Sequence, residues 1–522
     1  MLRKTLVAVS LAAVLSGCAV TPQAIDFKDI ASTADADVNL LAEEQEQVMG
    51  TITLDEAIAR AVRNNRDKKL KALESALAQG QIELVQHEML PSLTASAGYS
   101  ERSNYAASSS VTFENGEPSP LSDPTYSVSQ EKVRTTADIA FTWNVLDFGL
   151  SYVRAKQHAD RYLITRERER KVAHNISQEV RAAYWRAVSA DRLLKKIAPL
   201  SEQAAAALED SRRVEDLRLR SPLEALYYQR ELLDILRSLQ SLRQDLMNSK
   251  TELASLMGLK PGTEFDLWDV QSPRFEVPEL ALDVAQMEEL ALQHRPELLE
   301  THYQKRISAA ETRAALLDLL PGISLTAGAY TDSNDYLLNQ DWTSVGAQIS
   351  WNLFDVFRLG AERRMAKTRE ALAEEQRLAT SMAVLTQVHL STIRYQQAVQ
   401  SFELADRYLD VASRINDQTV NNARLERSSE LDLIRESLNT LLAELRRDVA
   451  YADVQNSYGR IYTTIGMDLV PQDYAGESLP SLTRQISERF EQWQRGELVS
   501  GVQAEPAGTE PADAAGSVDK VG

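Results

Sequence analysis

This chain of 522 residues is poor in three features that mark common protein classes. It has one cysteine, Cys18, which excludes an intrachain disulfide framework and a cysteine-based metal site. It carries 57 Lys and Arg against 76 Asp and Glu, and this net charge of −19 argues against nucleic-acid binding. After residue 20 no run of 18 apolar residues occurs, so any membrane-spanning part must consist of strands.

The sequence motifs of common enzymes are also missing. There is no HExxH pair, no Gly-rich phosphate loop after a strand and no G-x-S-x-G elbow. The six histidines are scattered, and each is expected to lie on a helix surface: His87, His158, His174, His294, His302 and His389. We therefore predict no enzymatic activity, no metal and no cofactor.

The N-terminus has the pattern of a secretory signal peptide, predicted over residues 1–17. A basic start precedes an apolar stretch at residues 6–15. The following Leu-Ser-Gly-Cys resembles a bacterial lipobox, in which Cys18 is acylated and becomes the new N-terminus. Ala19 differs from the Asp of inner-membrane retention in the enterobacterial pattern, which favours the outer membrane. The alternative is an incidental cysteine beside an ordinary cleavage site.

The part of the chain between its two ends is a tandem repeat. The stretch FTWNVLDFG, which contains Trp143, returns as ISWNLFDVF, which contains Trp351. The separation from Trp143 to Gly258 equals that from Trp351 to Gly466 (258 − 143 and 466 − 351, both 115). The predicted units are a lipidated leader at 18–50, repeats at 51–260 and 284–468, equatorial segments at 261–283 and 469–498, and a disordered tail at 499–522.

Long helices follow from the scarcity of helix breakers. No glycine occurs from Leu150 to Met257, and neither glycine nor proline occurs from Ala361 to Tyr458. Each stretch is too long for one helix, and weak breakers around Ser221 and Ser429 predict a turn in each. We thus expect helical hairpins at 148–258 and 356–466, a kink at Pro199, and a single helix over 284–320.

Each repeat also supplies two segments in which apolar and polar residues alternate. The predicted strands span about 92–105, 133–146, 323–331 and 342–354. Such alternation is typical of half-buried strands, including those of a transmembrane barrel with apolar residues outside and polar residues inside. A soluble sandwich with a dry core is the alternative. Four strands cannot close a barrel, so the chain must share one, with eight strands in a dimer or twelve in a trimer.

The repeated W-N-x-x-D motif lies where an alternating segment meets a long helix. The tryptophans would belong to an interfacial aromatic girdle. Each Asp is expected to cap the helix that follows. The predicted barrel-to-tunnel junction therefore consists of Trp143, Asn144, Asp147, Trp351, Asn352 and Asp355.

With the duplicated unit, the W-N-x-x-D junctions and the lipobox, residues 51–470 resemble the TolC-like outer-membrane efflux factors, in their lipoprotein branch. The resemblance implies a homotrimer with a shared twelve-stranded β-barrel and a periplasmic α-helical barrel. It also implies an exit duct of tripartite pumps or type I secretion systems, with an inner-membrane transporter and a periplasmic adaptor as partners. The expected location is the outer membrane, with a lipid anchor and an extension into the periplasm.

The same resemblance implies roles for the helix tips. Positions associated with adaptor contact correspond to Ser221, Leu223, Ser429 and Leu431. The family aspartate that narrows the closed periplasmic entrance corresponds to Asp432, and Glu224 occupies the matching place in the first repeat. The tip glycine of the family is absent from both copies, and its second aspartate is replaced by Arg435, which joins the predicted gate.

We therefore predict a mainly α fold with a transmembrane β-barrel, built from two tandem helix–strand–strand–long-hairpin repeats in a homotrimer. The predicted function is a passive duct for efflux or secretion that is gated at its periplasmic tips. One alternative is a structural periplasmic coiled-coil lipoprotein without a pore, and another is an envelope-anchored enzyme. The acidic balance fits a cation-preferring lumen and a solvated exterior equally well.

Overall fold

The computed structural model describes residues 24–43, 48, 50–119, 125–217, 221–260, 262–270, 275–425, 429–471, 474 and 476–497. The predicted signal peptide, Cys18 and the predicted tail at 499–522 lie outside these residues.

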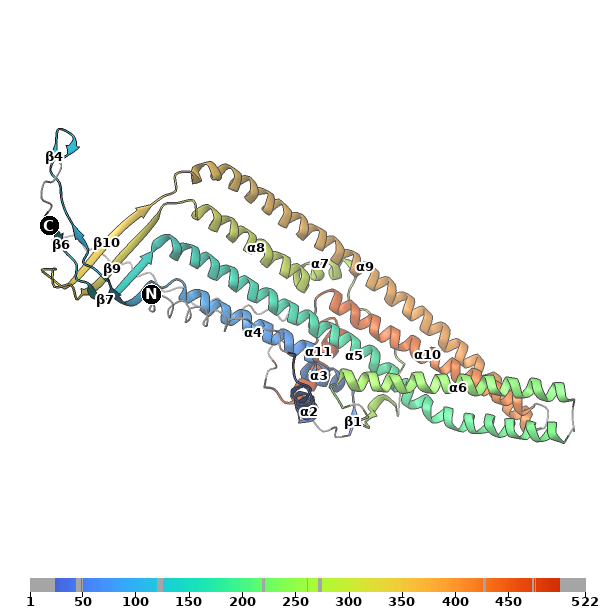
Figure 1. The fold of residues 1–522 in the computed structure, drawn as a ribbon. Helices are drawn as coiled ribbons and strands as arrows, with labels where there is room; N and C mark the ends of the chain where they lie inside the picture. Colours follow the sequence, from blue (N-terminus) through green and yellow to red (C-terminus); the bar gives the residue numbers. More distant parts are fainter. Residues whose placement is uncertain are drawn as a thin grey trace.

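Long helices make up most of the described chain (Figure 1). The helix α5 has 72 residues and α9 has 70, and α5 continues through Pro199 without interruption. The helices are α2 (Phe27–Glu43), α3 (Leu54–Asn64), α4 (Arg66–His87), α5 (Val145–Asp216), α6 (Pro222–Leu256), η1 (Trp268–Val270), α7 (Val284–His294), α8 (Pro296–Leu317), α9 (Asp355–Arg424), α10 (Glu430–Thr464) and α11 (Leu479–Gln494).

Four strands form one antiparallel sheet at the end of the molecule away from the hairpin tips (Figure 1). Its strands are β2 (Ser92–Glu101), β7 (Val133–Asn144), β9 (Gly322–Asp332) and β10 (Asp341–Ser350), in the order β10-β9-β7-β2. Two short ribbons extend beyond the sheet: β3 (Ala107–Ser108) with β6 (Ser127–Val128), and β4 (Phe113–Glu114) with β5 (Glu117–Pro118). A separate parallel pair, β1 (Thr51–Ile52) with β8 (Asp266–Leu267), lies near α2 and α3 instead (Figure 1).

The register keeps the two faces of this sheet distinct across all four strands. One row consists of Leu93, Phe141, Ala327 and Val345, and the adjacent row contains Thr94 opposite Ala140. Because side chains alternate between the faces of a strand, successive rows lie on opposite faces. Among the described residues no strand pairs with the outer edge of β2 or with that of β10.

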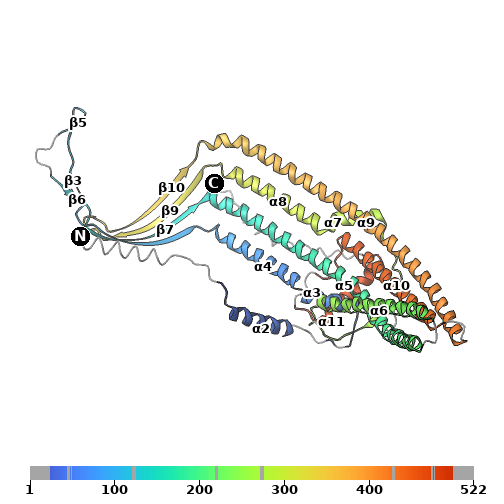
Figure 2. The ribbon, with the colours of Figure 1, turned by 45° about the vertical axis from the view of Figure 1, so that its right-hand side comes forward.

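The helices continue the sheet as a single layer in the same order. Below the strands, α4, α5, α8 and α9 lie side by side (Figure 2). Toward the hairpin tips, the order becomes α6, α5, α10 and α9. The protomer is thus a long slab whose edges are β2, α4 and α6 on one side and β10 and α9 on the other.

The expected single helix over 284–320 is wrong, because the helix is interrupted at Arg295, between α7 and α8. Arg295 has an extended backbone (φ −71, ψ 129), and Pro296 begins α8. A proline is favoured at the first position of a helix and disfavours helical geometry in the residue before it. Asn65 makes the corresponding break between α3 and α4, where its side chain accepts a hydrogen bond from the backbone of Lys68.

The main hydrophobic core lies at the middle level of the layer, which we call the equator. There α3, α7, α11 and residues 275–283 pack on α5, α9 and α10. Aromatic rings dominate one part of this core, with Phe275 against Tyr451 and Trp185 also against Tyr451, both at 5.0 Å. Among the described helices, none has a stretch long and apolar enough to cross a lipid bilayer.

Candidate functional site: junctions, tips and an equatorial polar network

The first junction begins its helix with an asparagine rather than with the expected aspartate. The side chain of Asn144 accepts hydrogen bonds from the backbone N–H groups of Leu146 (3.0 Å) and Asp147 (3.4 Å). This makes Asn144 the N-cap, whereas Asp147 lies inside the first turn, so the capping role expected for Asp147 is wrong. Trp143 packs edge to face on Phe148 with ring centroids 6.0 Å apart.

The second junction has a different local structure. The side chain of Asn352 accepts from the backbone of Phe354 (3.2 Å) and donates to the Asp355 carboxylate (3.1 Å). Asp355 is the first residue of α9 rather than its cap, so the expectation is wrong here as well. Trp351 donates its indole N–H to the carbonyl of Leu319 (3.1 Å), which ties the start of α9 to the end of α8.

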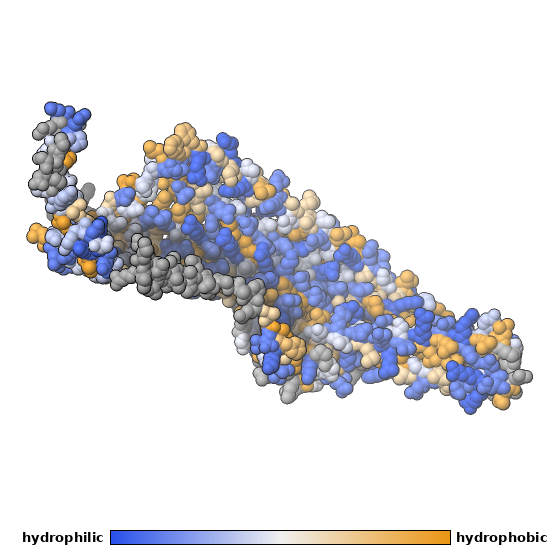
Figure 3. Space-filling model, viewed as in Figure 1, coloured by the Kyte–Doolittle hydropathy of each residue, from blue (hydrophilic) through white to orange (hydrophobic). Residues whose placement is uncertain are grey.

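Large apolar side chains are exposed where β10 passes into α9. They have exposed fractions from 55% to 81%: Leu353, Phe354, Val356 and Phe357. Figure 3 shows hydrophobic colours at this end of α9. Soluble monomers rarely expose contiguous apolar patches, so such a surface is typical of a contact with lipid or with another chain.

At the tip of α10, Asp432 takes part in a capping box. The Ser429 hydroxyl accepts from the backbone of Asp432 (3.2 Å), and the Asp432 carboxylate accepts from the Ser429 backbone (3.3 Å) and hydroxyl (2.6 Å). The side-chain hydrogen bond from Ser429 is the main cause that holds the pKa of Asp432 below its usual range, with a further contribution from Arg435. Asp432 therefore stabilises the start of α10 as a carboxylate.

Arg435 joins the two tip hairpins through a residue that the sequence did not single out. Its guanidinium contacts the Glu231 carboxylate of α6 at 2.6 Å and Asp432 at 3.4 Å. Glu231 and Arg435 are 204 positions apart, and no local pattern marks their contact. Thus the structure brings Asp432 and Arg435 together and adds Glu231 to them.

The tip of α6 lacks a comparable box. Ser221 is its N-cap without a side-chain hydrogen bond, and Pro222 follows at the first helical position. Glu224 and Leu223 are exposed in the first turn, and Leu431 of α10 is half-buried against the lower core. The tips also expose a group of large apolar side chains: Leu217, Leu223, Leu226, Tyr227 and Leu425.

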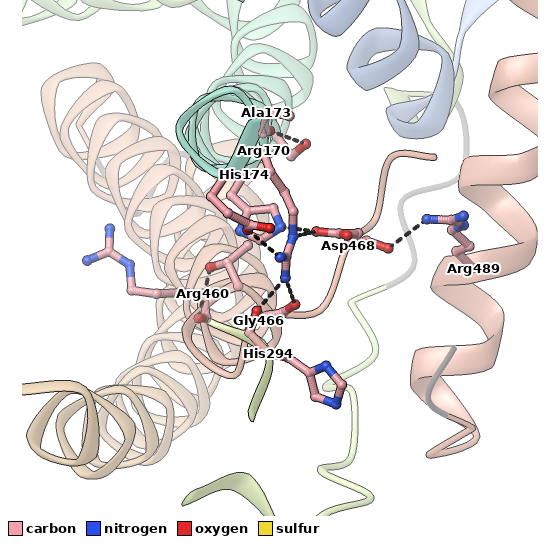
Figure 4. A network of polar contacts seen from close by, with 11 residues as sticks. Arg170, Ala173, His174, His294, Arg460, Gly466, Asp468 and Arg489 are labelled. Atoms are coloured by element: carbon pink, nitrogen blue, oxygen red, sulfur yellow. Dashed lines mark hydrogen bonds and ion pairs between the residues drawn. The ribbon is translucent and has the colours of Figure 1, made fainter. Parts of the chain in front are cut away.

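A buried polar network at the equator centres on Arg170 of α5 (Figure 4). Its guanidinium donates to the Asp468 carboxylate (2.7 Å), to Glu167 (2.7 Å), and to the main-chain carbonyls of Gly466 (2.8 Å) and His294. These carbonyls end α10 and α7, and a cation near a helix C-terminus is stabilised by the helix dipole. One side chain therefore fastens the ends of two helices to α5.

Asp468 is the second centre of this network. It also receives the ring Nε2 of His174 at 2.6 Å, and its backbone carbonyl accepts from Arg489 of α11 at 3.2 Å. Burial alone would raise the pKa of Asp468, but His174 and Arg170 outweigh burial and hold this pKa well below its usual range. His174 is 8% exposed, so the expectation of a helix-surface histidine is wrong at this position.

The equatorial network borders a cavity of about 270 Å³. Its lining includes Lys68, Arg170, His174, Asp468 and Tyr474. The ammonium group of Lys68 in this cavity has partners: it contacts the Glu169 carboxylate at 3.0 Å and lies 4.4 Å from the ring centre of Tyr474. Within the described residues no group of three or more His, Cys, Asp or Glu could hold a metal ion. The contacts of the network are those of a structural element that joins α5 to the ends of α7 and α10 and to α11.

Comparisons with known proteins agree with this architecture. The family model described as outer membrane efflux protein matches residues 288–426, which begin within α7 and include all of α8 and α9. Among curated protein sequences, none matches the chain significantly.

Solved structures match over most of the chain. The CmeC outer membrane channel of Campylobacter jejuni is 14% identical with a TM-score of 0.61, covering 85% of this chain and 93% of its own. The outer-membrane channel OprN is 18% identical with a TM-score of 0.59, covering 79% and 89%. The MtrE outer membrane channel of Neisseria gonorrhoeae, in its open state, is 17% identical with a TM-score of 0.56, covering 78% and 88%.

The helical layer and its sheet thus have the fold of these outer-membrane channels. The chain's resemblance to the TolC-like outer-membrane efflux factors is confirmed, and the segment 288–426 carries the sequence signal of the outer membrane efflux proteins.

Proposed function

We propose that this chain is one protomer of a homotrimeric exit duct in the outer membrane. Three copies would contribute twelve strands to a shared barrel and continue it into the periplasm as a helical tunnel. The duct would receive substrates from an inner-membrane transporter through a periplasmic adaptor, for efflux of small molecules or for type I secretion. Cys18, outside the described residues, would carry the lipid anchor.

The observation that carries this proposal is the pair of open edges on one continuous slab. Edge strands β2 and β10 have ten residues each, and an unpaired edge of that length is a template for another strand. The two edges run antiparallel, so β10 of one copy beside β2 of the next preserves the alternation of the sheet. Closure also removes the unpaired backbone groups that lipid cannot satisfy.

The edge helices support the same arrangement. On α4, one stripe of leucines is exposed: Leu70, Leu73, Leu77 and Leu84. On α9, exposed apolar residues extend over most of the helix: Met365, Leu372, Leu378, Met382, Leu390, Ile393, Leu404, Tyr408, Val411 and Ile415. Edges that are apolar over such a length favour contact between copies over exposure to water.

At the tips, we propose that the cluster of Asp432, Arg435 and Glu231 helps to hold the periplasmic entrance narrow, with Glu224 nearby on α6. The exposed leucines at the tips, with Ser221 and Ser429, would form the adaptor-contact surface. The W-N-x-x-D residues would mark the level at which the barrel passes into the tunnel.

Reconstitution into planar lipid bilayers tests the duct. Purified protein should give stepwise conductance, and a non-porous coiled-coil lipoprotein should give none. If well-folded protein inserts and no steps occur, either in the natural chain or after the tip contact is removed by Arg435→Ala, the proposed duct is refuted.

A further inference from the structure

A groove between α9 and α10 carries a charge opposite to that of the whole chain. It has a volume of about 630 Å³, a size typical of small-molecule sites, and its charged lining residues are Arg394, Arg446, Arg460 and Asp453. The chain as a whole has a net charge of −19. This groove therefore concentrates positive charge on an acidic protein.

The groove lies on the face of the helices opposite to the equatorial elements. On α10, Arg446, Asp453 and Arg460 recur every seven residues and share one exposed face. Tyr451 and Tyr458 also recur after seven residues, but both are buried. The two sets are offset by two positions, which is about 200° around an α-helix.

The buried face is the one that the equatorial elements cover. Tyr451 donates to the carbonyl of Glu276 at 3.2 Å, and Tyr458 packs against Phe490 of α11 with centroids 6.2 Å apart. Figure 4 agrees, because the guanidinium of Arg460 points to the side of the helices away from Arg489 and α11. In a tube of three slabs, these equatorial elements would obstruct the passage if they lay inside, so the groove faces the lumen.

The three arginines have no competing carboxylate partner in the part of the chain that the structure describes, where none of them takes part in an ion pair. Arg446 lies 6.0 Å from the ring centre of Tyr408 instead. Asp453 is the one acidic residue that lines the groove, and burial raises the pKa of its carboxyl, although Arg186 opposes this shift.

The remaining lining residues fit an anion with an apolar body. Hydrogen-bond donors stand beside the arginines: Gln397, Ser401, Asn456 and Ser457. Apolar residues form the rest of the groove: Ala398, Leu445, Val449 and Ala450. Guanidinium groups bind carboxylate and related oxyanions through paired, charge-assisted hydrogen bonds.

We propose that this groove is a binding station on the duct wall for organic anions, molecules that join a carboxylate or sulfonate to an apolar body. Three copies would place one station per protomer at the level of the equator. The inference rests on the proposed duct, since the groove faces a lumen only when the slabs close into a tube. Its role would be to raise the local concentration of anionic substrates in a passage whose protein is acidic.

The test compares block of the reconstituted channel by two probes with the same aromatic body. One is 8-anilino-1-naphthalenesulfonate, and the other is N-phenyl-1-naphthylamine, which lacks the sulfonate. The test variant is R394Q/R460Q, one change on each groove helix. The matched control is R484Q/R495Q, which removes the same charge on the opposite face, from Arg484 of α11 and from Arg495, the C-cap residue of that helix. Arg394, Arg460 and Arg484 are exposed, so we expect normal folding.

We expect the sulfonate to block the natural channel, and R394Q/R460Q to weaken that block by roughly tenfold, since each exposed charge contact contributes a few-fold. The reversal potential in a KCl gradient should shift toward cation preference in the same variant. The control variant and the neutral probe should show no change. The charge-conserving R394K/R460K should retain the reversal potential and lose part of the block.

The outcomes separate the two proposals. Absence of conductance in every variant would refute the duct itself. Normal conductance with equal sulfonate block in the natural channel and R394Q/R460Q would refute the station alone. An equal effect of R484Q/R495Q would also refute it, because the block would then depend on overall charge.

Discussion

Replacing Asp468 with Asn tests whether the equatorial network holds the helical layer together. The Asp468 carboxylate is 7% exposed and accepts charge-assisted hydrogen bonds from Arg170 and His174 at 2.7 and 2.6 Å. A hydrogen bond to a charged group contributes about 1.5–3 kcal/mol, and removing one partner of a buried ion pair costs about 3–5 kcal/mol. Because Arg170 keeps Glu167 and the amide oxygen still accepts one bond, we expect a loss of about 2–3 kcal/mol.

The assay is the apparent melting temperature in detergent at a fixed scan rate, followed by intrinsic fluorescence. For a chain of 522 residues, a loss of this size should lower it by roughly 2–3 °C. The matched control is Asp410→Asn on α9, whose carboxylate is exposed and 3.7 Å from Arg414, and which should change stability by at most a few tenths of a kcal/mol.

The pH dependence has a definite sign. The folded-state pKa of Asp468 is lowered from its ordinary value of 3.8, so its stabilisation is present above that value and is lost as the pH falls below it. The difference between Asp468→Asn and the natural chain should therefore be full at pH 7 and shrink below about pH 4. A variant no less stable than Asp410→Asn, or a difference that stays constant down to pH 3.5, would refute the reasoning.

Three further predictions concern other parts of the molecule. Gly466→Ala should lower the free energy of unfolding by about 2 kcal/mol or more, since its φ is +80 and a Cβ would lie 2.6 Å from the backbone of His294. The control Gly476→Ala, with φ +94 and open space around it, should lower it by about 1 kcal/mol. Equal melting temperatures of the two variants would contradict this. Trp143→Asp or Trp351→Asp should reduce the assembled protein recovered from outer membranes, and unchanged yield on quantitative blotting would contradict it. Arg435→Ala should increase the fraction of time that the channel is open by a few-fold, an effect kept small because the contact with Glu231 is half-exposed. Unchanged single-channel records would show that this contact does not hold the tips.

The long helices and the alternating segments could be read from the sequence because each follows a local rule. Glycine and proline are scarce over 150–257 and absent over 361–458, and α5 and α9 lie largely in these stretches. The apolar and polar positions of the strands also keep separate rows in the sheet. A local rule was available for the break before α8 as well, because Pro296 marks a helix start.

The contacts that join distant segments could not be read in this way. Arg170 and Asp468 are 298 positions apart, and nothing near either residue indicates its partner. From the sequence, His174 was expected on the surface of its helix. In the structure, the chain that follows α10 covers that side of α5 through Asp468. The capping of α5 depended on backbone geometry at the junction, where Asn144 and Asp147 were both suitable acceptors by sequence.

Disulfide trapping between the edge strands tests the central claim, a wall shared between copies, most directly. Ala95→Cys on β2 is combined in turn with Val345→Cys, Ala347→Cys and Ile349→Cys on β10, all in one face of the sheet. Within one protomer these strands are three spacings apart, about 14 Å, too far for a disulfide, whose Cα atoms lie about 4.4–6.8 Å apart.

Any disulfide must therefore join two copies. Oxidation in outer membranes should convert at least one pair into covalent species that end at three protomers, while Ala95→Cys with Leu325→Cys on the inner strand β9 should remain monomeric. Monomer alone in all three edge pairs, in correctly inserted protein, would contradict the shared wall.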